Sequence, residues 1–308
     1  MKKIFQKTIA NQISFAGIGL HTGKFAKLKI LPSRADTGIT FKRVDLKKDN
    51  LIKANYKNVK SATLCTTLEN DHGVKVSTIE HLMAALYIGQ IDNAIVEIDN
   101  EEVPIMDGSA KDFLNLLKTS GTKQLPKERK YLKISEEIKL TEGTREISIT
   151  PYDTLEIDFQ LDYRNNAIIG KQRNTVNLHK DDLSDISNSR TFCLYEDLEK
   201  IKKMGLAKGG SLDNAIVVDD DKVINSGGLR NDKEFVNHKI LDLVGDLLLS
   251  NYRILGKIKC NKGGHELTNL FLRKLLSSQN STVSSEKNQF KKLKKYDQNQ
   301  FTKLAVNA

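Results

Sequence analysis

One predicted helix carries acidic side chains through apolar surroundings, and this pattern constrains the chain more than any other. In the segment 235–249, His238, Asp242 and Asp246 follow one another at intervals of four residues. Side chains at this spacing share one stripe of a helix. Leucine, isoleucine and valine cover most of the remaining surface, which predicts a helix buried on several sides. Because carboxylates are costly to remove from water without a cation or strong donors, a positive group should face this stripe.

Two kinds of positive group are compatible with the stripe. One is a divalent metal, and the other is a buried ion-pair network in which Lys239 or an arginine neutralises the aspartates. The histidines favour the metal, because the chain has only six of them and two others lie in segments typical of functional sites.

The first of these segments is Ser-Thr-Ile-Glu-His-Leu-Met-Ala-Ala-Leu, residues 77–86. Ser77 and Glu80 match a capping box, which predicts a helix that starts here and has an apolar face. In one interpretation Glu80 only caps this helix and His81 is an ordinary core or surface histidine. In the other, His81 binds a metal and Glu80 is a carboxylate base beside it.

The second segment is Lys-Gly-Gly-His-Glu, residues 262–266, at the start of another amphipathic pattern. Two glycines allow positive φ or a close approach of the backbone to a neighbour. His265 is therefore predicted to be an exposed but positioned group. The alternative is an ordinary glycine-rich turn between a strand and a helix.

The three segments together fit one chemistry. His81, His238 and Asp242 would supply three ligands of a tetrahedral zinc and leave the fourth position for water, as in catalytic rather than structural zinc sites. Zinc lowers the pKa of a bound water from about 15.7 to about 7.

The remaining polar side chains of these segments fit proton transfer. Glu80 would accept a proton from the attacking water, and His265 would protonate a leaving amine. Asp246 would hold the His265 ring and keep it protonated. The predicted reaction is metal-assisted hydrolysis of an amide or an ester.

Seven motifs, including these three, resemble in sequence and order those of the UDP-3-O-acyl-N-acetylglucosamine deacetylase family, over roughly residues 1 to 277. That family carries out the committed step of lipid A biosynthesis. The other four motifs are Gly-Ile-Gly-Leu-His-Thr-Gly (17–23), Val-Pro-Ile-Met-Asp-Gly-Ser (103–109), Ser-Arg-Thr-Phe (189–192) and Gly-Gly-Ser-Leu-Asp-Asn-Ala (209–215).

The resemblance implies the same metal ligands, base, acid and acid partner as the residues alone. It adds a hydroxyl at Thr191 that helps to hold the oxyanion, and a positive charge from Lys239. It also implies that Phe192, Gly210 and Ser211 lie in segments that flank the substrate.

Two polar residues of the matching motifs are predicted to take no direct part in the reaction. Asp107 has a structural role in its loop in the preferred interpretation. His21 is structural or peripheral, because three ligands are already assigned.

The resemblance also implies the substrate and cofactor. The substrate is UDP-3-O-acyl-N-acetylglucosamine, which loses its N-acetyl group as acetate and becomes a free amine. One catalytic zinc ion is expected, with Fe²⁺ as the alternative native metal. An insert at about residues 193–220 would hold the fatty acid; the alternative is that the insert simply packs against its domain.

Strand and helix patterns mix in both halves of the chain, which predicts an α+β fold. Strands are expected at 26–31, 93–98 and 155–163, and helices from about 77, 232 and 266. The polar stretch 118–130 is the predicted linker between an N-terminal domain, 1–122, and a C-terminal domain, 130–280, followed by a polar basic tail, 281–308. The resemblance implies two similar domains, each a sheet with paired helices, stacked so that the active site lies between them.

Composition restricts the location and the partners. The three cysteines are odd in number, and no signal peptide or stretch of about 20 apolar residues is present, so a cytoplasmic protein without a transmembrane segment is expected. The net charge of +10 is scattered, tryptophan is absent and aromatic residues make up 6%, so no nucleic acid is expected as a partner. A monomer is expected, with peripheral contact between its basic surface and the inner membrane face.

Two other functions are alternatives to that of a deacetylase. A zinc hydrolase of another amide, such as a peptidase, is disfavoured because the chain has no His-Glu-x-x-His. The other is a basic binding protein without enzymatic activity, in which the histidines are structural.

Overall fold

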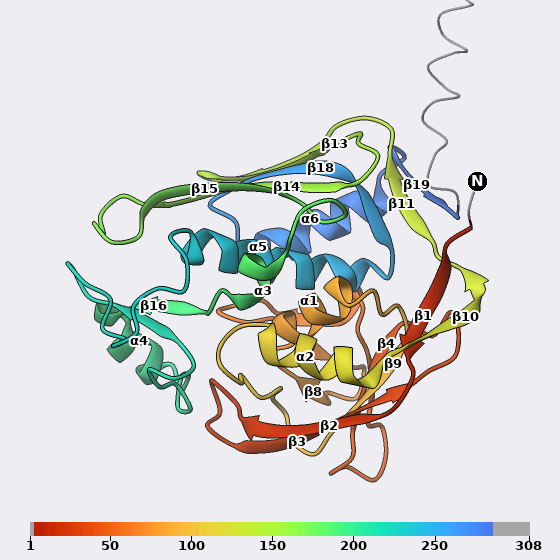
Figure 1. Cartoon of the computed structure of the whole chain (residues 1–308), viewed down its shortest axis with the longest axis horizontal. Helices are drawn as coiled ribbons and strands as arrows, with labels where there is room; N and C mark the ends of the chain where they lie inside the picture. Colours follow the sequence, from red (N-terminus) through yellow and green to blue (C-terminus); the bar gives the residue numbers. More distant parts are fainter. Residues whose placement is uncertain (1–2, 286–308) are drawn as a thin grey trace, which may run out of the picture.

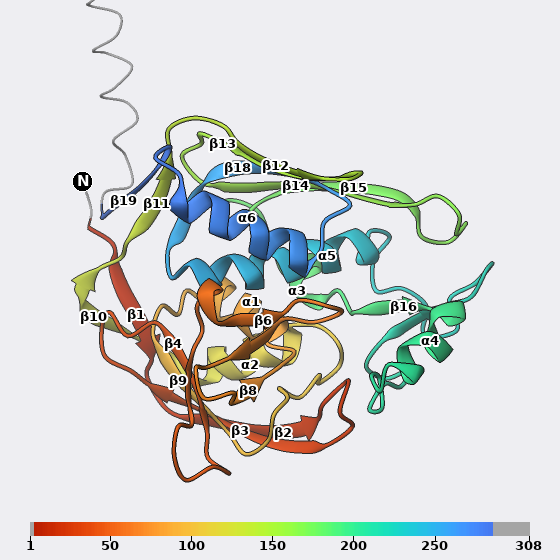
Figure 2. The same cartoon turned by 180° about the vertical axis from the view of Figure 1, so that it is seen from behind.

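Two large β-sheets enclose a layer of helices in this protein (Figures 1 and 2). The computed structural model describes residues 3–285. The sheet built from the earlier part of the chain has five strands and is called the N-terminal sheet; the C-terminal sheet has seven. The α+β class is confirmed. The exact division into domains at 1–122 and 130–280 stays a prediction.

The N-terminal sheet has its strands in the order β2-β3-β9-β4-β5. Side chains of β3 alternate between exposed and buried, as expected for a sheet with one face on the core. The strands predicted at 26–31 and 93–98 are present as β3 and β9. The bounds are Ile13–Ile18 (β2), Phe25–Pro32 (β3), Ala94–Ile98 (β9), Ile39–Arg43 (β4) and Leu51–Lys53 (β5).

The C-terminal sheet is centred on β18, which pairs with β11, β13 and β14. The strand predicted at 155–163 is present as β14, and its apolar side chains are buried. The bounds are Tyr131–Ile134 (β11), Ile138–Glu142 (β12), Arg145–Thr150 (β13), Leu155–Tyr163 (β14), Gly170–Asn177 (β15), Arg253–Asn261 (β18) and Ser281–Ser284 (β19).

The helices that matter for the site, α1, α5 and α6, lie between the sheets (Figure 2). The helix α5 is buried along its whole length, except at Lys239, which is partly exposed. Predicted helix starts near 232 and 266 agree with α5 and α6 to within two residues. The bounds are Glu80–Ile88 (α1), Lys111–Ser120 (α2), Ser184–Asn188 (α3), Leu198–Lys203 (α4), Glu234–Leu247 (α5) and His265–Ser277 (α6).

A glycine in α5 permits the close approach of α1. A Cβ atom at Gly245 would lie 2.1 Å from the carbonyl oxygen of Glu80. Glycine normally weakens a helix interior, but here any larger residue would push the start of α1 away. This contact brings the first turn of α1 onto the aspartate stripe of α5.

The polar stretch predicted as a linker is largely a strand. Residues 118–120 end α2, and β10 (Thr122–Glu128) pairs antiparallel with β1 (Phe5–Ile9). Strand pairing uses main-chain groups, so the polar side chains of β10 can stay exposed while its backbone is paired. The connection between the two sheets is therefore a structured ribbon.

The expected acyl-binding insert lies to one side of the layers (Figure 1). The strands β16 (Phe192–Leu194) and β17 (Ile216–Val218) pair in parallel, and α4 lies between them in the chain. A separate three-stranded sheet contains β6 (Val59–Ser61), β7 (Thr67–Glu69) and β8 (Lys75–Val76).

The predicted basic tail begins within the fold. Its first residues form β19, which pairs antiparallel with β11. The rest of the predicted tail, 286–308, lies outside the described residues. Within residues 3–285, no helix is long and apolar enough to cross a membrane.

Candidate active site and metal centre

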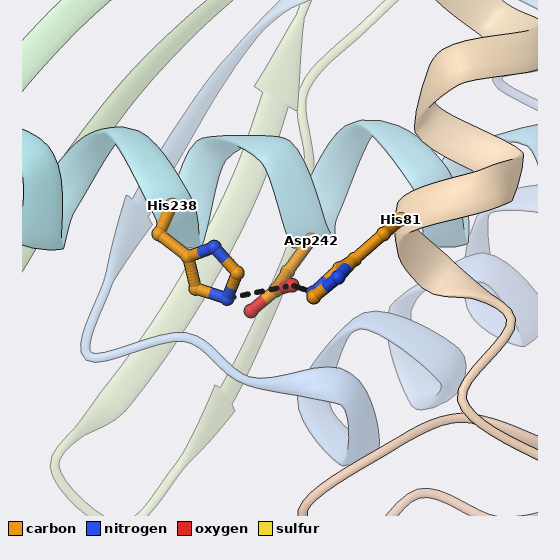
Figure 3. A group of neighbouring side chains, drawn as sticks. All are labelled: His81, His238 and Asp242. Carbon is orange, nitrogen blue, oxygen red and sulfur yellow. Dashed lines mark ion pairs between the residues drawn. The ribbon is translucent and has the colours of Figure 1, made fainter. Parts of the chain in front are cut away.

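Three predicted metal ligands converge where α1 packs on α5 (Figure 3). His81 comes from the first turn of α1, and His238 and Asp242 come from one stripe of α5. One possible ligand atom from each residue lies within 4.8 Å of the other two, and all three side chains are buried. This group can hold a metal ion.

The chemistry of the donor atoms fits a cation. Nδ1 of His238 lies 3.1 Å from the carbonyl oxygen of Ser189 and donates a hydrogen bond to it. The Nε2 lone pair then faces Oδ1 of Asp242 at 3.3 Å, and Nε2 of His81 lies 3.4 Å from the same oxygen. Burial lowers the pKa of His238 to about 3, although Asp242 opposes this shift, so the ring is neutral. Two electron-rich atoms at this distance repel unless a cation lies between them.

Lys239 accounts for only part of the charge on Asp242. Its Nζ donates to Oδ2 at 2.9 Å, while the buried Oδ1 makes no hydrogen bond. Burial raises the pKa of Asp242, but nearby positive charge, including that of Lys239 and His265, outweighs burial and holds this pKa well below its usual range. The ion-pair alternative thus satisfies one carboxylate oxygen and leaves the other free to bind a metal.

A histidine and two carboxylates lie next to the three predicted metal ligands. Nδ1 of His265 is 2.7 Å from Oδ2 of Asp246, and Nε2 is 3.8 Å from Oε1 of Glu80. Burial alone lowers the pKa of His265, but the carboxylates, with Asp246 first among them, outweigh burial and raise that pKa to about 10. His265 is buried, so the prediction of an exposed histidine was wrong. The ring packs inward because Asp246 receives it on the inner face of α5.

The sequence interpretation missed Thr66, which joins the two carboxylates of the site. Its backbone N–H donates to Glu80 at 3.1 Å, and its hydroxyl donates to Asp246 at 2.7 Å. Burial raises the pKa of Glu80, although His265 and His81 oppose this shift. Thr66 follows Cys65 in a segment without any pattern of its own, so only its position between the two carboxylates reveals it.

The predicted capping box is not formed. The helix α1 starts at Glu80 without a side-chain cap, and the Ser77 hydroxyl donates to the carbonyl of Glu101. Between them Thr78 has φ 55°, a left-handed conformation held by its hydrogen bond to Glu102. This turn directs the Glu80 side chain into the site instead of back along the helix.

An apolar cavity of about 270 Å³ lies between the insert and the rest of the site. Thr191, Phe192, Gly210 and Ser211, all predicted to be near the substrate, line it. The Phe192 ring lies 6.3 Å from the ring of His238, and it has Nζ of Lys239 above it at 5.6 Å. Phe192 therefore lies between the cavity and His238, and Leu198 and Ile201 of α4 form another part of the cavity wall. Besides His21, the other lining residues are Leu20, Leu64, Cys193, Leu198, Ile201, Lys202, Ala207, Leu212, Ala215 and Val217.

Asp107 and His21, which are predicted to take no direct part in the reaction, lie in different environments. Asp107 pairs with Arg230 at 2.9 Å and accepts hydrogen bonds from Ser109, as expected for a loop residue. His21 lines the apolar cavity, and neither of its buried ring nitrogens makes a hydrogen bond within the described part of the chain. Burial lowers its pKa, and Glu102 opposes this shift.

Comparisons with known proteins agree on one family. Residues 6–277 match the family model described as UDP-3-O-acyl N-acetylglycosamine deacetylase (LpxC). A protein named UDP-3-O-acyl-N-acetylglucosamine deacetylase from Shewanella oneidensis is 40% identical over 288 residues, which cover 92% of this chain and 94% of the relative. A protein of the same name from Aliivibrio fischeri is 40% identical over 278 residues, or 90% of this chain and 91% of the relative. The chain belongs to the UDP-3-O-acyl-N-acetylglucosamine deacetylase family.

Proposed function

We propose that this protein removes the N-acetyl group from UDP-3-O-acyl-N-acetylglucosamine, releasing acetate and a free amine in lipid A biosynthesis. One observation carries the proposal: the group of His81, His238 and Asp242 lies beside Glu80 and the His265–Asp246 pair. Metal ligands, a base and an acid around one point are what hydrolysis of an unreactive amide requires.

Zinc is the proposed metal. Two imidazole nitrogens and one carboxylate oxygen match the ligand sets of catalytic zinc, which keep one position open. When bound, zinc would polarise the acetamide carbonyl and make water acidic enough to attack at neutral pH. The same donors suit Fe²⁺, so metal analysis of the protein purified from its native host decides between the two.

The residues of the chain move the protons. Glu80 would take a proton from the attacking water, since its carboxylate faces the site and its raised pKa makes it a stronger base than an exposed glutamate. His265 would give a proton to the nitrogen of the leaving amine, and Asp246 keeps that imidazole protonated. The developing negative charge on the carbonyl oxygen would be stabilised by Thr191 and Lys239.

The apolar cavity is the proposed binding site for the acyl chain. Its walls are mainly aliphatic, and it opens beside the metal ligands, where the sugar must lie. Phe192, Gly210 and Ser211 would contact the substrate there. A cytoplasmic location, a monomeric state and peripheral contact with the inner membrane face stay predictions from the sequence.

The direct test is release of acetate from UDP-3-O-acyl-N-acetylglucosamine by the purified protein, before and after metal removal and zinc addition. Activity that is lost with the metal and returns with zinc would support both the substrate and the metal. A folded, zinc-loaded protein that releases no acetate would contradict the proposed function. Acetylated peptides and other acetamidosugars serve as control substrates, and they should stay intact.

The pH profile of kcat/KM should depend on Asp246. Glu80 must be ionised, and burial raises its pKa, so the acid-side fall in activity should begin at a higher pH than an ordinary glutamate would give. His265 must be protonated, so activity should also fall as the pH rises toward about 10. The substitution Asp246→Asn removes the main carboxylate that raises the pKa of His265, so the alkaline fall should move to lower pH.

The matched control for this shift is Asp158→Asn. Asp158 pairs with Arg173 on β14 and β15, away from the site, so this variant should keep the wild-type profile. An unchanged alkaline limit in Asp246→Asn would contradict the role of Asp246 as the partner of His265.

A further inference from the structure

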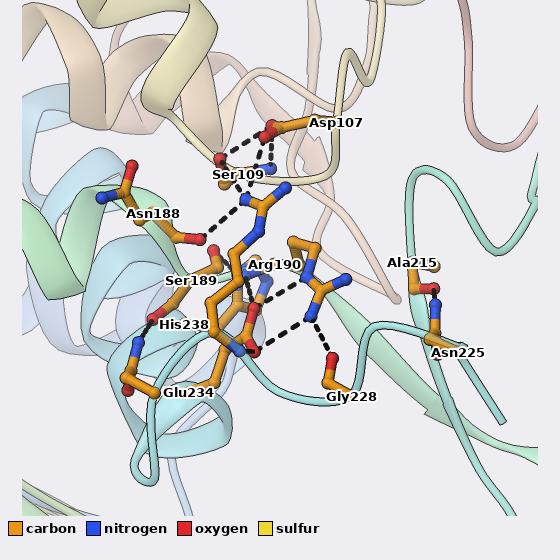
Figure 4. Close-up of polar contacts among 12 residues, drawn as sticks. Asp107, Ser109, Asn188, Ser189, Arg190, Ala215, Asn225, Gly228, Glu234 and His238 are labelled. Atoms are coloured by element: carbon orange, nitrogen blue, oxygen red, sulfur yellow. Dashed lines mark hydrogen bonds and ion pairs between the residues drawn. The ribbon is translucent and has the colours of Figure 1, made fainter. Parts of the chain in front are cut away.

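A fully buried carboxylate in the first turn of α5 organises the segment that precedes the insert (Figure 4). Glu234 is 0% exposed. Its Oε1 accepts hydrogen bonds from the backbone N–H and the Nε of Arg190, at 3.1 and 2.8 Å. Its Oε2 accepts from a second nitrogen of the Arg190 guanidinium at 3.2 Å and from the backbone N–H of Arg230 at 2.6 Å.

These hydrogen bonds fix the register between residues 189–191 and α5. Because Glu234 binds the backbone of Arg190 as well as its side chain, the segment cannot slide along the helix without breaking several bonds. The carbonyl of Ser189, one residue earlier, is thereby placed over Nδ1 of His238, one helical turn after Glu234. A hydrogen bond at one imidazole nitrogen determines which nitrogen is left to bind a metal.

The residue after Arg190 is held from the other half of the molecule. The backbone N–H of Thr191 donates to the carbonyl of Gly108 at 2.8 Å, and a Cβ at Gly108 would lie 2.1 Å from the carbonyl oxygen of Asn214. Gly108 has φ 86°, which favours glycine. The loop at residues 107–109 therefore fits tightly against the segment that carries Thr191.

Arg230 closes the network. Its side chain donates to the carbonyl of Asn188 at 2.9 Å and pairs with Asp107, also at 2.9 Å. Its backbone N–H is bound by Glu234. Glu234 thus binds Arg190, within the segment 189–191, and Arg230, which contacts the residue before this segment.

We propose that Glu234 is a positioning residue: through Arg190 it places the Ser189 carbonyl against His238 and, in the same segment, the hydroxyl of Thr191. This inference rests on the proposed function and adds to it a residue that touches neither metal nor substrate. A buried ion pair by itself is poor support for stability, because desolvation opposes the attraction between the charges. The four hydrogen bonds that Glu234 accepts, two of them from backbone N–H groups, instead favour a role in geometry.

Glu234→Gln is the first test, because it keeps the size of the side chain and removes its charge. Substitution of a residue that orients a metal ligand typically lowers metal affinity or activity about 10- to 100-fold. Since Glu234 acts through Ser189, we expect the lower end, about a 10-fold weaker Kd for Zn²⁺ and a similar fall in kcat, with KM nearly unchanged. Zn²⁺ affinity is measured on the metal-free full chain by competition with a chelator.

Asp92→Asn is a matched control. Asp92 is also a carboxylate between two arginines, Arg129 and Arg253, and it accepts a backbone N–H from Lys7. It lies beyond the C-terminal end of α1, whereas His81 lies in the first turn. We expect Asp92→Asn to lower the melting temperature while Zn²⁺ affinity and kcat stay at wild-type values.

Arg190→Lys covers the case in which Glu234→Gln does not fold, because it keeps the positive charge and loses the forked hydrogen bonds. Weaker Zn²⁺ binding in either variant, with wild-type binding in Asp92→Asn, supports the proposal. Two results would overturn it. One is wild-type Zn²⁺ affinity and kcat in every Glu234 and Arg190 variant that folds. The other is an equal loss of Zn²⁺ affinity and kcat in Asp92→Asn. A wild-type protein that binds Zn²⁺ but releases no acetate would contradict the proposed function alone, since the metal readout is independent of the substrate.

Discussion

His81→Ala is expected to remove both the bound metal and the activity. The substitution leaves two of the three proposed ligands, both on α5, and removes the one ligand that α1 contributes. A catalytic metal supplies several kcal/mol of transition-state stabilisation, which corresponds to a fall in kcat of at least about 1,000-fold. Zinc content per chain, measured by elemental analysis after dialysis, should fall from about one to near zero.

His72→Ala is the control for this loss. His72 lies in the same half of the chain, and its side chain is 62% exposed beside Asp49. This variant should bind one zinc ion and release acetate at the wild-type rate. If His81→Ala retained a full complement of zinc, His81 would not be a ligand and the proposed metal centre would be wrong.

His265→Ala is expected to give a different combination, a bound metal without activity. A positioned general acid contributes about 100- to 10,000-fold to a rate, so kcat should fall by that factor. His265 binds Asp246 through Nδ1 and is not one of the three clustered ligands, so zinc content should stay near one per chain. Acetate release is measured together with zinc content on the same sample.

The two substitutions distinguish a ligand from an acid. Loss of zinc in His265→Ala would mean that this histidine binds the metal, and a wild-type rate would mean that another group protonates the amine. The removal of His265 also leaves Asp246 and Glu80 without their positive partner. A lower melting temperature is therefore expected at neutral pH, and it should be measured so that unfolding is not mistaken for lost catalysis.

The α5 pattern could be read from the sequence because helix geometry is local. A spacing of four residues places His238 and Asp242 on one face whatever surrounds them. The apolar residues between them predict burial, which the structure confirms. The strand at 155–163 was predictable for the same reason, since alternation along a strand follows from its own pleat.

Errors arose where a distant partner competes with a local pattern. Ser77 and Glu80 have the spacing of a capping box, but each is bound elsewhere, by Glu101 and by Thr66. His265 follows two glycines, as an exposed turn residue would, yet Asp246 draws its ring into the interior. Local propensity is a weak prior, and tertiary contacts can override it.

Thr66 shows why the rest of the site could not be predicted. Its hydrogen bond to Asp246 joins residues 180 positions apart. Nothing in Thr-Leu-Cys-Thr-Thr distinguishes this threonine from its neighbours. The resemblance to the deacetylase family assigned roles to Thr191 and Lys239, but it gave no role to Thr66 or Glu234.

The sequence by itself determined that a histidine and two aspartates would share a buried stripe, and therefore that a cation must face them. Only the tertiary structure decided what completes the site. The absent side chain of Gly245 lets α1 approach α5, so that His81 meets Asp242 and the carboxylate of Glu80 faces His265. The reason is physical: helical periodicity depends on neighbours along the chain, whereas the convergence of α1, α5 and α6 depends on packing between segments that are distant in sequence.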